Sequence, residues 1–192
     1  METRPHQAGI RREVLAEMEL AESQILALAE IVRPEDYLWA PAPDARTFAA
    51  LLVHLAVENL GLLDHAGARV PEAIDFYSGI DDTSTARIAS IMRKNLLVEK
   101  SVKEKASIID LLTQSFAAVK ESWITATEEQ LWITIHPFGE LETARRLYLR
   151  MLAHSHEHMG QAIAYARAIG YQVPWPDPVK KLVEMEASLA ER

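Results

Sequence analysis

Apolar side chains recur along most of the chain with a period close to 3.6 residues, and this pattern predicts helices. Residues 9–32 carry one apolar position every three or four residues, and Pro34 ends that segment. Residues 48–66 are apolar on almost every side as far as Glu58, which is typical of a helix buried all round. Thr47 stands directly before this stretch, where its side chain can cap the first turn.

The second half of the chain predicts two more long helices. Ser107 and Asp110 resemble a capping box, with Asp in place of the usual Glu or Gln, and they would open a helix that runs to about Thr125. Residues 142–169 form the other helix, without an internal proline and with a glycine directly after it. Asp177 would cap a terminal helix that has a proline at its first position.

The segments between these helices are less regular. Residues 35–46 follow Pro34 and contain Pro41 and Pro43, so this segment is expected to be a connector. Trp39 lies in it and is expected to pack against one end of the core. Residues 69–105 include only a short helical pattern, and the charge-rich run 99–105 favours a solvated face or linker. Four long helices, shorter extra helices and no convincing strand pair predict an all-α four-helix bundle with a C-terminal helix, as a single domain over residues 1–192.

Composition and charge exclude several classes of protein. The net charge is −8 and there is no basic run, so no nucleic-acid partner is expected. No apolar run approaches the length that spans a bilayer and no signal region is visible, so we expect a cytoplasmic protein without a membrane partner. Cysteine is absent, which rules out disulfides, thiolate metal sites and a cysteine nucleophile. Any metal ion must therefore be held by nitrogen and oxygen atoms.

A histidine pair provides the first candidate chemistry. His154 and His158 are four residues apart in the last long helix, so their side chains lie on the same face and can share one divalent ion. His156 projects from another face, and Gly160 stands where the second histidine of an HExxH motif would be, which disfavours a metalloprotease of that type. Gln161 returns to the face of His154 two turns later.

His54 is the third candidate, in the middle of the apolar helix. Taken alone, it could equally be a core histidine with a hydrogen-bond partner. Glu58 follows one turn later on the same face, and two stacked polar groups in such an apolar helix favour a functional site.

These features together resemble the DinB/YfiT-like family of four-helix bundle metalloproteins. Where that family often has a further histidine, this chain has Glu157, at a position that is not usually a ligand. The resemblance covers residues 38–43 (LWAPAP), 51–56 (LLVHLA), 137–140 (PFGE), 154–161 (HSHEHMGQ) and 167–170 (RAIG), followed by Pro174.

The resemblance implies one divalent metal ion bound by His54, His154 and His158, with water in the open positions. Three neutral imidazoles with an open position match the pattern of catalytic rather than structural zinc. Zinc or nickel is the expected ion, and imidazole ligands also admit manganese or iron. Glu58 is expected to act as a base or additional ligand, and Gln161 to orient a ligand or water.

The resemblance also implies a function. Several relatives resemble thiol transferases that use a low-molecular-weight thiol, which would here have to arrive as a cosubstrate and bind the metal as a thiolate. The enzymatic alternative is a metal-dependent hydrolase that activates water. A non-catalytic protein that binds a metal or small molecule is the alternative from another class. A small-molecule substrate and a homodimer are the expected partners.

Overall fold

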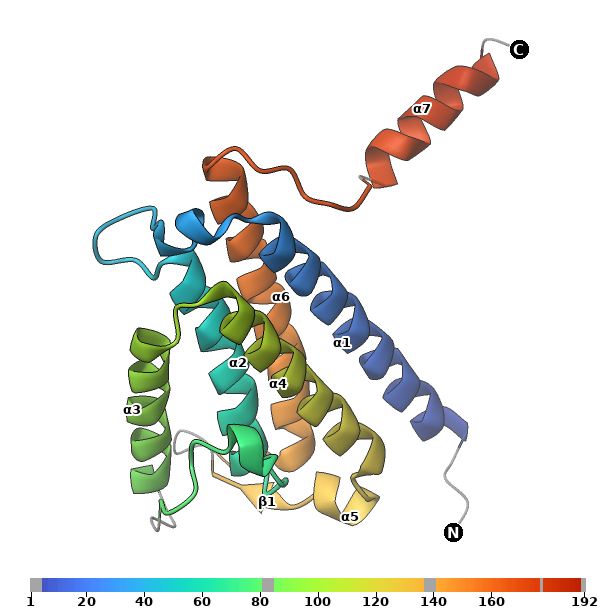
Figure 1. Ribbon diagram of the computed structural model, residues 1–192. Coiled ribbons are helices and arrows are strands. Elements are labelled where there is room, and N and C mark those ends of the chain that lie inside the picture. Colours follow the sequence, from blue (N-terminus) through green and yellow to red (C-terminus); the bar gives the residue numbers. More distant parts are fainter. Residues whose placement is uncertain (1–4, 81–84, 137–140, 177, 191–192) are drawn as a thin grey trace.

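Four long helices form the body of the protein, and the computed structural model describes residues 5–80, 85–136, 141–176 and 178–190. Helices α1 and α2 each pack against both α4 and α6 (Figure 1). This arrangement confirms the predicted all-α four-helix bundle. The four helices are α1 (Pro5–Ile31), α2 (Phe48–His65), α4 (Lys105–Thr125) and α6 (Ala144–Ala168).

Helix α2 is the most apolar element and lies in the core. Thirteen of its 18 residues are buried, and the Thr47 hydroxyl accepts a hydrogen bond from the Ala50 amide at 3.1 Å, which confirms the predicted cap. By length and hydropathy alone α2 would be apolar enough to cross a membrane, so the expectation that no apolar run approaches that length is wrong for residues 48–65. Its burial against α3, α4 and α6 accounts for that composition.

Helix α3 (Thr85–Ser101) lies outside the four-helix body and packs on α2. The Tyr77 hydroxyl is buried where these two helices meet, 2.8 Å from the carbonyl oxygen of Val57 and 2.6 Å from Oδ1 of Asn95.

The expectation that residues 99–105 form a solvated face or linker is wrong for Glu99, which belongs to α3 and is buried. A carboxylate at the end of a charged run can still face inward, because a helix turns its side chains to every side.

The predicted capping box at Ser107 and Asp110 is also wrong. Helix α4 begins at Lys105, so both residues lie inside it, and its N-cap makes no side-chain hydrogen bond. A capping box is instead present at Thr127 and Gln130, where it opens the short helix α5 (Glu128–Leu131). The pattern of residue types is common enough to occur within a helix, and only the chain path shows which copy is used.

Short elements close the bundle ends. The 3-10 helices η1 (Pro34–Leu38) and η2 (Glu72–Ile74) lie in the connectors. Strands β1 (Thr134–Ile135) and β2 (Glu142–Thr143) pair antiparallel, with Thr134 opposite Thr143. Helix α6 therefore starts two residues later than the helical pattern predicts. The segment 137–140, which contributes to the family resemblance, lies outside the described residues.

The C-terminal helix α7 (Pro178–Ala190) projects away from the bundle in Figure 1. Gly170, with φ +92°, provides the left-handed residue that ends α6. Pro178 occupies the first position of α7 as predicted, whereas Asp177 lies outside the described residues. Exposed apolar side chains on α7 are Val179, Leu182, Val183, Met185 and Leu189.

Candidate metal centre

Helices α2 and α6 bring three imidazole rings to one point. One ring nitrogen from each of His54, His154 and His158 lies within 4.8 Å of the other two. The Nε2 atoms of His154 and His158 are 2.9 Å apart, and the ring centroid of His54 lies 5.2 Å and 4.8 Å from theirs. Two of the rings come from successive turns of α6 and the third from the packed face of α2, so the helix–helix contact builds the cluster.

Hydrogen bonds at the outer nitrogens orient two of the rings. Nδ1 of His54 lies 2.8 Å from a carboxylate oxygen of Glu99, and Nδ1 of His158 lies 2.9 Å from Oε1 of Gln161. An ionised carboxylate and an amide oxygen only accept hydrogen bonds, so each Nδ1 carries the proton when the ring is neutral. Nε2 of both rings is then left with its lone pair, as a metal ligand requires.

His154 is held differently, by burial. Its side chain is 7% exposed, and its Nδ1 is buried without a hydrogen-bond partner among the described residues. Burial, together with the positive charges that His158 and His54 would carry, lowers the pKa of His154 to about 3. Burial also lowers the pKa of His158, and the hydrogen bond to Gln161 opposes that shift. Both rings are therefore neutral at pH 7, and a cluster of three imidazole nitrogens suits a divalent cation.

The carboxylate beside His54 is a residue that the sequence reasoning missed. Burial raises the pKa of Glu99, but hydrogen bonds from His54 and Arg46 outweigh it and hold the pKa below its usual value. Nε of Arg46 donates to the second carboxylate oxygen of Glu99 at 2.9 Å. No spacing rule links residues 54 and 99. The only signal in the sequence was a glutamate one turn after Asn95 on the face of α3 that also carries apolar Ile91 and Val98.

The two predicted catalytic residues lie in different surroundings. Gln161 contacts the cluster through His158, and its amide nitrogen donates to the Tyr165 hydroxyl at 3.3 Å. Glu58 is not part of the three-nitrogen group, and its carboxylate accepts a hydrogen bond from Asn95 at 3.1 Å where α2 meets α3. Catalytic roles for both residues stay predictions.

Trp39, Tyr77, His136 and Tyr165 are four side chains whose chemistry would suit a substrate pocket. Trp39 packs edge-on against Tyr165, with ring centroids 5.5 Å apart, and so joins the residues that adjoin Gln161. Tyr77 is 1% exposed and is held between α2 and α3. His136 is exposed. Of the four, Tyr165 and Trp39 are therefore the ones connected to the histidine cluster, through Gln161.

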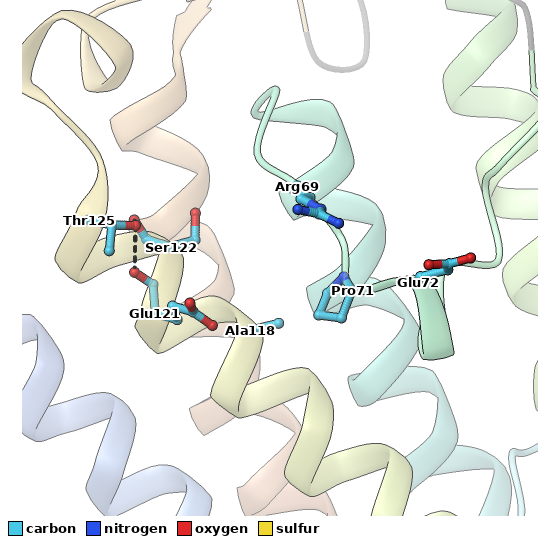
Figure 2. A pocket seen from close by; sticks show the side chains of 7 residues that line it. All are labelled: Arg69, Pro71, Glu72, Ala118, Glu121, Ser122 and Thr125. Atoms are coloured by element: carbon cyan, nitrogen blue, oxygen red, sulfur yellow. Dashed lines mark hydrogen bonds between the residues drawn. The ribbon is translucent and has the colours of Figure 1, made fainter.

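A separate cleft opens near the C-terminal end of α2 (Figure 2). Its volume is about 390 Å³, and Arg69, Pro71 and Glu72 face Ala118, Glu121, Ser122 and Thr125 of α4 across it. A neighbouring cavity of about 440 Å³ shares Arg69, Ser122 and Thr125 and extends to His65. His65 is eleven residues after His54, about 16 Å along the helix axis. Because of this distance, the cleft and the neighbouring cavity are distinct from the histidine cluster.

Several solved structures of other proteins share this fold. Solved structures with this arrangement include a DinB-like protein from Bacillus cereus ATCC 10987, with TM-score 0.64 and 16% identity over 85% of this chain and 95% of that one. A DinB-like protein from Bacillus subtilis has TM-score 0.56 and 19% identity over 85% and 96% of the two chains. The mycothiol-dependent maleylpyruvate isomerase has TM-score 0.58 and 13% identity over 78% of this chain and 59% of its own. At these identities the likeness shows the fold alone.

The sequence itself carries the assignment to a family. No curated protein sequence gives a significant match. The family model of the DinB superfamily matches residues 17–162, which include all three clustered histidines and Gln161. The match spans well over half of the chain, and the chain belongs to the DinB superfamily.

Proposed function

We propose that this protein is a metal-dependent enzyme in which His54, His154 and His158 hold one divalent cation. The observation that carries the proposal is the convergence of three ring nitrogens within 4.8 Å, two of them on rings whose pKa is lowered. The rings of His154 and His158 are thus available as neutral donors at pH 7. Zinc or nickel is the ion we expect, because borderline divalent ions favour imidazole.

Three protein ligands leave coordination positions open, as in catalytic rather than structural sites. When bound there, the ion would lower the pKa of a thiol or a water molecule and so supply a nucleophile at neutral pH. The chain has no cysteine, so a sulfur nucleophile would come from a low-molecular-weight thiol cosubstrate. A thiol S-transferase reaction is the activity that we propose, and the fold shared with a mycothiol-dependent enzyme supports it.

The residues around the cluster would orient the metal ligands rather than take part in the reaction. Glu99 and Gln161 hold the Nδ1 protons of His54 and His158, so both Nε2 atoms stay free as donors. The amide nitrogen of Gln161 reaches Tyr165, which packs on Trp39. We propose that this aromatic pair borders the place where the small-molecule substrate binds.

Metal content is the first test. Protein purified without added metal is expected to contain about one divalent ion per chain by elemental analysis, and His154→Ala is expected to lose it. His156→Ala is the matched control, because His156 is on the same helix but contacts Glu17 instead of the cluster. Equal metal content in His154→Ala and His156→Ala would refute the proposed metal site.

Activity is the second test. A panel of thiols and electrophiles is expected to reveal a transfer reaction that His54→Ala abolishes. Turnover of an ester or amide without any thiol would replace the proposal with a metal-dependent hydrolase. Bound metal with no turnover of either kind would leave a non-catalytic metal-binding protein. The expected homodimer stays a prediction that sedimentation analysis can check.

A further inference from the structure

We infer that Glu99, anchored by Arg46, is a positioning residue for His54 and sets how tightly the three-histidine site binds its metal. The inference rests on the proposed metal site and adds a residue of α3, a helix outside the four-helix body, to the residues that control it. The carboxylate would fix both the proton on Nδ1 and the orientation of the ring, and so point Nε2 at the other two histidines.

Both oxygens of the carboxylate are used. Oε1 lies 2.8 Å from Nδ1 of His54, and Oε2 accepts from Nε of Arg46 at 2.9 Å. The Glu99 side chain is 7% exposed and that of His54 is 12% exposed, so little water competes for the bond. Arg46 in turn is 39% exposed and supplies the positive charge that offsets burial of the carboxylate. The arrangement forms a continuous chain of charged hydrogen bonds from the surface to the ring.

An anchoring role alone accounts poorly for this carboxylate. Burying an ion pair in place of apolar side chains is often neutral or unfavourable for stability. Helix α3 is already fastened to α2 by buried Ile91 and Val98 and by Asn95, which bonds to both Glu58 and Tyr77. A leucine at position 99 would extend the apolar contact between α3 and α2. A buried charge aimed at a ring nitrogen is explained if the ring must be held in one tautomer.

The three rings also differ in what holds them. His158 has the neutral amide of Gln161 on its own helix, and Nδ1 of His154 has no partner among the described residues. Of the three, His54 alone bonds to a carboxylate in the part of the chain that the structure describes. An anionic acceptor raises the basicity of the opposite nitrogen more than an amide does. Glu99 is thus expected to make His54 the strongest donor of the three.

The experiment compares metal affinity in the whole protein. Zinc affinity is measured by competition with a chromophoric chelator, and cobalt(II) absorption reports the geometry of the bound ion. Glu99→Gln keeps the shape and can still accept from Nδ1 but loses the charge, and we expect roughly tenfold weaker zinc binding. Glu99→Leu loses the acceptor as well, and we expect a loss of up to about a hundredfold with an altered cobalt spectrum.

Asn95→Leu is the matched control, since it removes a polar contact between α3 and α2 one turn away without touching a histidine. A purely structural role for Glu99 predicts that all three variants lower the melting temperature of the metal-free protein while zinc affinity stays at the wild-type value. That result would overturn the inference. Zinc affinity that is unchanged in both Glu99→Gln and Glu99→Leu, whatever their melting temperatures, would overturn it too. Wild-type protein that binds no zinc would instead refute the proposed metal site itself.

Discussion

Oε1 of Gln161 lies 2.9 Å from Nδ1 of His158, one turn earlier on α6. The amide oxygen can only accept, so the contact assigns the ring proton to Nδ1 and leaves Nε2 facing His154. Spacing within one helix is enough to make this contact, because residues three apart are neighbours on its surface. Gln161 therefore has a physical role at the cluster, because it fixes the tautomer of His158.

Replacing Gln161 by leucine is expected to weaken zinc binding by roughly tenfold, because the ring of His158 loses the acceptor that fixes its tautomer. Gln161→Glu keeps an acceptor at the same place and is expected to bind zinc at least as tightly as the wild type. Chelator competition measures both. Gln114→Leu serves as the control, since Gln114 bonds to Asp110 on an exposed face of α4. An affinity in Gln161→Leu equal to that of the control would show that the contact does not matter.

Two glycines in helices should respond oppositely to alanine. A Cβ at Gly61 would lie 2.9 Å from Cγ2 of Ile91, where α3 packs on α2, whereas a Cβ at Gly160 meets nothing within 4 Å. Gly61→Ala is expected to cost about 1–3 kcal/mol in the free energy of unfolding through overpacking. Gly160→Ala is expected to add about 0.5–1 kcal/mol, because alanine is the better helix former. Urea denaturation compares them, and destabilisation by Gly160→Ala would contradict the open space seen there.

The histidine at the end of α2 should make stability depend on pH. Burial lowers the pKa of His65, and its Nε2 is buried without a partner in the described part of the chain. Below the ordinary histidine pKa of about 6.5 the unfolded chain binds a proton that the folded chain does not, so His65 lowers stability as the pH falls. We expect the melting temperature of metal-free His65→Leu to fall less between pH 7 and pH 5 than that of the wild type. An equal fall in both proteins would contradict the assignment.

The terminal helix should be dispensable for the site. Every residue of α7 whose burial the structure describes is exposed, and the family match ends at residue 162. A chain that ends after residue 176 is expected to keep the zinc affinity and the melting temperature of the full protein. Trp175, which packs against the core, is retained in that variant. A drop in either quantity would show that α7 supports the bundle.

The sequence by itself determined the helices and most of the candidate site. Apolar periodicity placed the four long helices, since each must bury one face, and the i, i+4 spacing put His154 and His158 together whatever the tertiary structure. His54 was conspicuous because a polar ring in an almost wholly apolar helix needs a partner. Two helix starts were predicted at the wrong residues. The Ser107–Asp110 pattern and the start of α6 were misplaced because capping and strand pairing depend on the path of the neighbouring chain.

Only the tertiary structure decided which carboxylate serves the histidine. Glu58 is on the same helix as His54 and was expected to act as a base or additional ligand. Its carboxylate instead bonds to Asn95, and Glu99 from another helix makes the contact with His54. Contacts within a helix follow from its fixed geometry, so spacing alone placed Gln161 on the face of α6 that carries His154. A contact between helices depends on how α3 docks on α2, which is set by the fit of many side chains at once and leaves no periodic mark in the sequence.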